Sequence, residues 1–128
     1  MNKIKFYCSA ICLFFLGLSF QTQANDVNIG LFTDMQTYTP DGPTPVLSVT
    51  AQNSGPMIFQ DVHLGVISPE GNIYEYPDWN QSLQPWLPNF GIPANFSLPN
   101  TVITNLDTIP GGLSSGIWQA FFVLTDPG

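Results

Sequence analysis

The chain has almost no basic side chains and few thiols. Its two Lys, Lys3 and Lys5, lie within the first five residues, and it contains no Arg. Its two Cys, Cys8 and Cys12, lie in the apolar run that follows. Because binding to phosphate backbones or to anionic lipid depends on Lys and Arg, we exclude nucleic acid and anionic membranes as partners of the rest of the chain. A zinc site is disfavoured as well, because only one His and no Cys follow that run.

The first 24 residues have the layout of a cleavable secretory signal peptide. A charged start precedes the apolar stretch Phe6–Phe20, and Thr22 and Ala24 occupy the small-residue cleavage positions. The apolar run is shorter than the roughly 20 residues of a membrane span, which disfavours a retained anchor. We therefore predict cleavage after Ala24, a secreted or periplasmic location, and one mature domain over residues 25–128.

The predicted mature domain is strongly acidic and lacks Cys. All nine Asp and Glu residues follow position 24, so removing both Lys changes the formal charge from 2 − 9 = −7 to 0 − 9 = −9. No disulfide can restrict the unfolded state of the remaining 128 − 24 = 104 residues. The hydrophobic core must therefore supply the stability, and the aromatic residues make this feasible.

Hydrophobic periodicity predicts an all-β fold. No segment of the mature chain sustains an i, i+3, i+4, i+7 apolar pattern, whereas short alternating runs between Gly, Pro, Asn and Asp recur. The segment Ser68–Asn72 has turn chemistry and predicts a β-hairpin over residues 61–76. The last strand is apolar on both faces, which indicates a central position in a sheet. The strands we expect are Val27–Leu31, Val46–Asn53, Asp61–Ser68, Ile73–Tyr76 and Gly116–Thr125, with shorter ones at Phe96–Leu98 and Thr101–Asn105.

The segment 77–110 is rich in proline and harder to assign. Each Pro removes a donor from a strand ladder, so long strands are not expected there. A structureless loop of this length is unusual in a compact domain, and we expect the segment to pack onto the core. The side chains available for that packing are Trp79, Leu83, Trp86, Leu87, Phe90 and Phe96.

The start of the mature chain contains a motif of several turn and strand residues. Asp34 is followed four residues later by Tyr38, then by a Pro-Gly type of turn that Asp41 interrupts, and then by a strand that ends at Asn53. This pattern resembles the opening of immunoglobulin-like β-sandwich modules of bacterial secreted and surface proteins, and macroglobulin-type domains open in a similar way. Residues 61–76 resemble the next hairpin of such modules. The resemblance implies an immunoglobulin-like sandwich of roughly six or seven strands.

The last predicted strand extends the resemblance. Gly116–Phe122 is similar to a late strand of these modules, with Trp118 in place of the usual Tyr. If this is the next-to-last strand, the sandwich could lack its last one, and the edge beside it would be vacant. We expect that edge to accept a strand from a partner or from a swapped homodimer, or to be filled by the Pro-rich segment.

The chain contains no recognised catalytic motif. His63 and Asp61 are two residues apart and would share one face of a strand, but no Gly-x-Ser-x-Gly elbow accompanies them. We interpret the pair as polar residues on the wet face. Glu70 and Glu75 flank a hairpin turn without an evident cleft, and we interpret them as solvated rather than as a glycosidase pair. We therefore expect no enzymatic activity.

An aromatic segment suggests a carbohydrate site. Trp79, Trp86 and Phe90 are interleaved with Asn, Gln and Asp residues, a composition typical of surfaces where rings stack on sugars and amides bind hydroxyl groups. The competing interpretation is that these rings close the core, because aromatic side chains usually bury most of their area. Both interpretations stay open at this point.

Calcium is the one cofactor for which the residues offer a candidate site. Asp34, Asp41 and Asp126 lie in predicted turns, and no Lys or Arg competes for their oxygens. No Asp-x-Asp-x-Asp-Gly loop is present, and Asp is itself a common turn former. Calcium binding therefore remains an alternative to a purely structural role of these Asp residues in turns. We expect no other cofactor.

Together these features favour a non-catalytic secreted binding or structural module at a bacterial surface or in the periplasm. Its partner would be a protein or a carbohydrate at the cell surface. A carbohydrate-binding module is the alternative, and a small secreted hydrolase around His63 is the third. Because sandwiches of this kind have many roles, the fold alone does not select among them.

Overall fold

The computed structural model describes residues 4–12, 26–39, 41–82 and 84–127. These residues form two β-sheets packed as a sandwich, which confirms the predicted all-β class. They contain nine strands rather than six or seven. Nothing helical in this part of the chain is long and apolar enough to cross a membrane.

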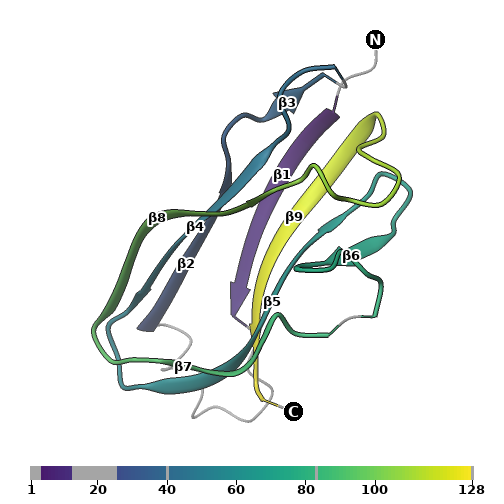
Figure 1. The fold of residues 1–128 in the computed structure, drawn as a ribbon. Helices are drawn as coiled ribbons and strands as arrows, with labels where there is room; N and C mark the ends of the chain where they lie inside the picture. The colour runs from purple at the N-terminus through teal and green to yellow at the C-terminus, as the bar shows by residue number, and fades with distance from the viewer. Residues whose placement is uncertain (1–3, 13–25, 40, 83, 128) are drawn as a thin grey trace.

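The two sheets differ in size and are shown in Figure 1. The larger sheet, sheet A, has the strand order β3-β1-β9-β5-β6, and β7 also pairs with β5. The smaller sheet, sheet B, has the order β2-β4-β8. Sheet A comprises β1 (Ile4–Cys12), β3 (Thr37–Tyr38), β5 (Ile58–Ile67), β6 (Ile73–Glu75), β7 (Leu87–Ile92) and β9 (Gly116–Thr125). Sheet B comprises β2 (Val27–Thr33), β4 (Val46–Asn53) and β8 (Phe96–Asn105).

Alternation of apolar residues places one face of each central strand in the core. Strands β4 and β9 have the predicted bounds, and β9 lies between β1 and β5, which confirms its central position. On β9, Trp118, Ala120 and Leu124 are buried, whereas Ile117 on the opposite face is half exposed. The inner faces of the two sheets therefore meet in one core, which also contains Val27, Leu31, Leu47, Val49, Ile58, Val62, Leu64, Val66 and Phe122.

The predicted hairpin over residues 61–76 is present. Strands β5 and β6 pair antiparallel, with Ile67 opposite Ile73. The turn between them is closed by a hydrogen bond from the Ser68 N–H to the Asn72 carbonyl, at 2.8 Å. Gly71 has a φ of 93°, which a side chain would disfavour. The turn chemistry in the sequence therefore determines this connection.

The Pro-rich segment packs against the core, as predicted, but it contains more strand than expected. Strand β7 includes Pro88 and pairs with β5 through an irregular register between Gln60 and Val62. Strand β8 is one strand of ten residues with two register shifts, where two short strands were expected. Trp79 is buried, and Trp86, Leu87 and Phe96 pack against the core. Leu83 lies outside the described residues.

Strand β1 is the main departure from the sequence analysis. It comes from the segment that we predict to be a signal peptide, yet in the full chain it belongs to the sandwich. It pairs in parallel with β9 over its whole length, from Ile4 opposite Gly116 to Cys12 opposite Leu124. The edge predicted to be vacant or filled by a partner is therefore occupied by this strand. The predicted cleavage position, Ala24, lies outside the described residues.

Candidate functional site

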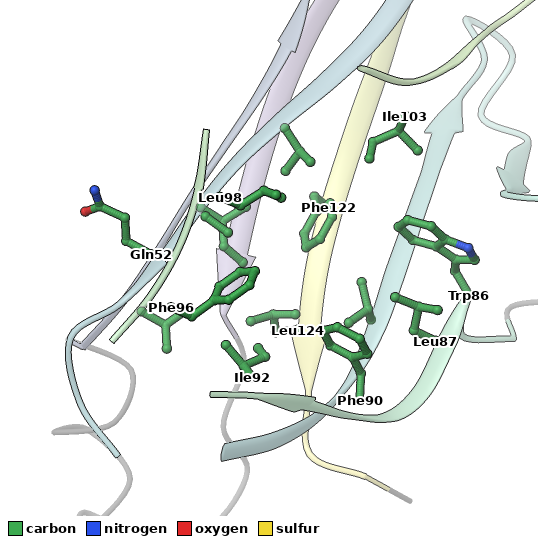
Figure 2. A pocket seen from close by; sticks show the side chains of 15 residues that line it. Gln52, Trp86, Leu87, Phe90, Ile92, Phe96, Leu98, Ile103, Phe122 and Leu124 are labelled. Atoms are coloured by element: carbon green, nitrogen blue, oxygen red, sulfur yellow. The ribbon is translucent and has the colours of Figure 1, made fainter. Parts of the chain in front are cut away.

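An apolar cavity of about 250 Å³ lies between the two sheets, beside β7 and the start of β8 (Figure 2). Both sheets contribute to its wall, and Trp86, Phe90 and Phe96 supply three aromatic rings. The lining residues are Val27, Ile29, Val49, Ala51, Gln52, Val62, Trp86, Leu87, Phe90, Ile92, Phe96, Leu98, Ile103, Phe122 and Leu124. Phe90 is partly exposed and the deeper residues Val62 and Leu124 are buried, so the cavity runs from the surface into the core.

Asn53 holds the turn between β7 and β8 beside the cavity. Its side chain is 1% exposed, and its Nδ2 donates hydrogen bonds to the carbonyls of Pro56 at 2.9 Å and Pro93 at 3.0 Å. Its Oδ1 accepts the Gly55 N–H at 3.0 Å. The Asn at the end of the strand, part of the family resemblance, therefore ties the end of sheet B to the turn that leaves sheet A.

The chemistry of the wall is almost wholly apolar. None of the lining side chains is an acid, a base, a thiol or a hydroxyl, and the Gln52 amide and the indole N–H of Trp86 are the polar groups among them. Figure 2 shows the Gln52 amide directed away from the labelled apolar side chains. Apolar cavities of this kind stay dry and can bind small apolar molecules, and a cavity of roughly 150 Å³ accepts benzene. The cavity can therefore hold an apolar group, and its wall supplies no group for acid–base chemistry.

The structure separates the three aromatic residues proposed to bind sugar. Trp86 and Phe90 line the cavity. Trp79 is 3% exposed, and its indole N–H donates to the Thr108 hydroxyl at 3.1 Å. The Tyr76 ring packs edge-on against both Trp79 and Trp86, at 5.5 and 5.1 Å between centroids. The interpretation of Trp79 as a sugar-stacking residue is therefore wrong, because the ring is enclosed in the core.

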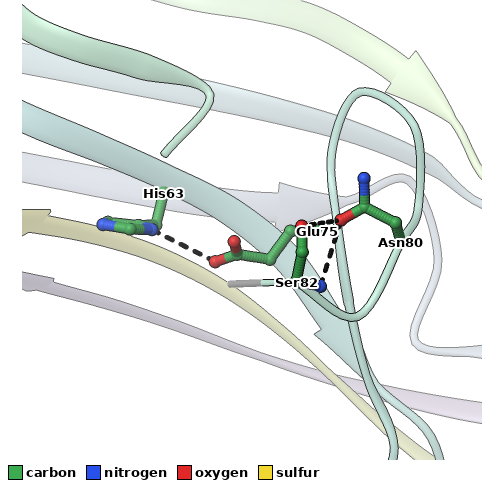
Figure 3. A network of polar contacts seen from close by, with 4 residues as sticks. All are labelled: His63, Glu75, Asn80 and Ser82. Atoms are coloured by element: carbon green, nitrogen blue, oxygen red, sulfur yellow. Dashed lines mark hydrogen bonds and ion pairs between the residues drawn. The ribbon is translucent and has the colours of Figure 1, made fainter. Parts of the chain in front are cut away.

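A polar pair lies on the outer face of sheet A (Figure 3). His63 Nδ1 is 3.1 Å from Glu75 Oε1, and the two side chains are 19% and 6% exposed. The second carboxylate oxygen of Glu75 is buried and has no hydrogen-bond partner among the described residues. Glu75 lies opposite Gly65 in the hairpin, and His63 is its diagonal neighbour on the same face. A long side chain reaches a diagonal neighbour. The expectation that Glu75 is solvated is therefore wrong.

The pair does not form the hydrolytic site that was considered. Asp61 Oδ1 accepts the Asn89 N–H at 2.7 Å, while His63 uses Glu75 as its carboxylate. The hydroxyl drawn in Figure 3, that of Ser82, donates its hydrogen to Asn80 Oδ1 at 2.6 Å. A nucleophile must instead be within hydrogen-bond reach of its base. The spacing of Asp61 and His63 therefore identified the correct face but not the carboxylate that pairs with the imidazole.

Asp34, a proposed calcium ligand, has a structural role. Its Oδ1 accepts hydrogen bonds from the Tyr38 hydroxyl and from the Val46 N–H. Partial burial opposes ionisation, but these bonds and those from its own and the Met35 N–H outweigh it and lower the pKa of Asp34. Burial, together with the bond to the carboxylate, raises the pKa of Tyr38 to about 12. The Asp-x-x-x-Tyr spacing therefore closes the connection between β2 and β4.

The three proposed calcium ligands do not meet. Asp34 is bonded to Tyr38, which lies near the Gly116 end of β9, whereas Asp126 follows the other end of that strand. Ten residues of strand separate these ends by roughly 30 Å. Over the described ranges, no three acidic, His or Cys side chains are grouped so that they could hold a metal ion. A shared site for Asp34, Asp41 and Asp126 is therefore wrong.

Comparisons of the chain with family models, with curated proteins and with solved structures gave no match.

Proposed function

We propose that the chain is exported and that its mature part, residues 25–128, is a non-catalytic binding module. The observation that supports this most directly is the cavity of about 250 Å³ between the sheets. It is lined by aliphatic and aromatic side chains and by no titratable group, so it suits recognition rather than chemistry. Its ligand is a molecule or side chain with an apolar group of about the size of one or two fused rings.

The acidic character of the mature part restricts that ligand further. Every Asp and Glu of the chain lies in residues 25–128 and no Lys or Arg does, so the module repels anions at neutral pH. An anionic amphiphile is disfavoured for this reason. A neutral or cationic molecule that presents an apolar group is the ligand class that the cavity and the charge favour together.

The carbohydrate alternative has less support. With Trp79 buried, Trp86 and Phe90 are the two rings left, and both contribute to an apolar wall. A sugar in that cavity would leave most of its hydroxyl groups without partners, because the Gln52 amide and the indole N–H of Trp86 are the polar groups among the lining side chains. A hydrolase is not proposed, since in the part of the chain that the structure describes His63 is bonded to Glu75 and the Ser82 hydroxyl donates to Asn80 rather than to His63.

The test is a titration of the full chain with N-phenyl-1-naphthylamine, a neutral apolar fluorophore. We expect saturable fluorescence enhancement that n-octanol reverses and that cello-oligosaccharides do not. Ala51→Phe fills the cavity and is expected to weaken dye binding at least about tenfold, since overpacking removes the space for the ligand. The matched control, Ala94→Phe, places the same side chain at an exposed turn position and is expected to leave binding unchanged.

Two results would argue against this function. Equal dye binding by Ala51→Phe and Ala94→Phe would show that the dye binds elsewhere, and Leu98→Phe provides a second cavity-filling variant if the first does not fold. Displacement by an oligosaccharide, but not by octanol, would favour the carbohydrate alternative. Export is tested separately, by the N-terminal residue of the protein recovered from the periplasm or medium: residue 25 is expected, and Met1 would contradict cleavage.

A further inference from the structure

The edge of sheet A beside β9 is made by a segment that export would remove. All nine residues of β1 are paired with β9, and β3 is attached to sheet A through β1. The inference that follows rests on the proposed export, because cleavage after Ala24 detaches Ile4–Cys12 from the mature chain. Strand β9 then keeps β5 on one side and has no strand on the other among the residues that the structure describes.

Strand β1 shows what this groove recognises. Ile4 and Phe6 point inward and are each 2% exposed, whereas Tyr7 on the other face is 46% exposed. The Phe6 ring stacks on Trp118, with centroids 6.1 Å apart and an interplanar angle of 23°. It also meets Tyr38 edge-on at 5.9 Å and 89°. The groove therefore has a slot for an aromatic ring between two buried aromatic side chains.

A second slot lies two residues earlier along β1. Ile4 contributes to a hollow of about 180 Å³ that Tyr38, Pro45, Leu106 and Leu113 also line. Leu106 is buried and its N–H donates to the Pro45 carbonyl at 3.0 Å, so this wall is held by its own backbone. The aliphatic side chain two residues before the aromatic one is enclosed here, as the 2% exposure of Ile4 shows, and it borders this hollow rather than filling it. The two slots together define a spacing and an order of side chains along the groove.

Removing β1 leaves this groove uncovered. The faces of Trp118 and Tyr38 that contact Phe6 would be exposed to water, as would the backbone groups of β9 that pair with β1. Unpaired backbone groups at the edge of an apolar strand attract another extended chain. A segment that adds to the edge supplies main-chain hydrogen bonds, and its alternate side chains supply specificity.

We infer that the mature module binds an extended segment of another protein, which lies parallel to β9 in the place of β1 and carries an aliphatic residue two positions before an aromatic residue. The direction is that of β1, which pairs with β9 in parallel, and the same sequence on an antiparallel segment would present the two side chains in the reverse order. The occupant is another protein rather than a strand swapped from a second copy because, apart from the two-residue β3, every strand that the structure describes after residue 26 keeps a partner within its own sandwich when β1 is removed. The Asp-x-x-x-Tyr turn positions Tyr38 on the wall of this groove.

The experiment starts from the folded full chain. A protease site is substituted within residues 15–22, and the chain is cut after folding. A fluorescein-labelled peptide of residues 3–13, with C8S and C12S, is then added. We expect the cut chain to take up the peptide by exchange with its own β1 and the uncut chain to take up at least about 100-fold less, since its β1 remains tethered.

Peptide variants test the two slots and the direction. Phe6→Ala in the peptide is expected to weaken binding by about 100-fold or more, the effect of truncating a buried Phe. Tyr7→Ala, on the exposed face, is expected to change binding less than about threefold. A peptide of reversed sequence has the same composition and is expected to bind as weakly as the Phe6→Ala peptide.

Several results would overturn the inference. These are equal binding of the wild-type, Phe6→Ala and reversed peptides, no uptake by the cut chain, or formation of a homodimer in light scattering that the peptide does not dissociate. If the exported protein begins at residue 25, any of these results refutes the inference that a segment of another protein binds in the place of β1. The export proposal then stays intact. An exported protein that begins at Met1 refutes the export proposal instead, and with it the open groove.

Discussion

Replacing Phe6 by Ala in the uncut chain tests whether β1, which lies in the predicted signal peptide, is part of the folded sandwich. Phe6 is buried between Trp118 and Tyr38, so truncation leaves a cavity that those two rings cannot readily fill. Buried Phe→Ala substitutions cost about 3–5 kcal/mol. A chain of 128 residues unfolds with an entropy of about 0.27 kcal/mol/K, so each kcal/mol corresponds to roughly 4 °C in Tm. We therefore expect Tm to fall by about 11–19 °C.

The assay is thermal unfolding followed by near-UV circular dichroism, which also reports the environment of Trp118. Tyr7→Ala is the matched control, because Tyr7 is the next residue of β1 but is half exposed on the opposite face. Its effect should stay within about 0.5 kcal/mol, or roughly 2 °C. If Phe6→Ala and Tyr7→Ala gave the same small shift, β1 would not be packed in the core and the reasoning from its contacts would be refuted.

Three further substitutions test how the sandwich is held together. Tyr38 has a pKa raised to about 12, so its neutral form contributes stability that is complete below about pH 10 and is lost as pH rises to about 12. Alkaline urea titrations should therefore show a smaller loss of unfolding free energy for Tyr38→Phe than for the wild type, and parallel curves would contradict the assignment. Gly65→Ala should lower the free energy of unfolding by about 1–3 kcal/mol in the same assay at pH 7. The added Cβ would lie 2.4 Å from the Tyr74 carbonyl oxygen and 2.5 Å from the Phe121 ring. An unchanged urea midpoint would contradict that packing. Asn53→Ala should lower the free energy of unfolding by at least about 1–3 kcal/mol, since buried carbonyls lose their donor. It should also expose the turn between β7 and β8 to proteolysis. Unchanged cleavage of that turn would contradict the role of Asn53 in holding it.

The sequence predicted the strands that form continuous runs between turn residues. Strands β4 and β9 have the expected bounds because β4 alternates apolar and polar side chains without interruption and β9 is apolar on both faces over its whole length. Strand β7 was missed because Pro88 disfavours a strand, although an edge position tolerates it. Strand β1 was missed for a different reason. An apolar run after two Lys residues is typical of a signal peptide, and no local pattern reveals a parallel partner more than 100 residues away.

The candidate sites were less predictable because composition does not determine burial. Trp79 and Trp86 lie in the same Pro-rich segment, yet one is enclosed in the core and the other lines a cavity. The partner of His63 was within reach of prediction. The hairpin over residues 61–76 places Glu75 opposite Gly65 and therefore on the face that His63 occupies. The cavity itself depends on how the inner faces of the two sheets pack against each other. The pattern of strands in the sequence does not specify that packing.

Hydrogen exchange along β9 tests most directly whether its edge is a replaceable binding groove. In the chain cut between residues 12 and 26, Phe6→Ala should speed the exchange of the β9 amides that face β1, at alternate residues, by about 100-fold, while amides that face β5 stay protected. Adding the wild-type peptide of residues 3–13 should restore the slow exchange. Protection of β9 that is the same with and without a bound strand, or that the peptide does not restore, would contradict the account.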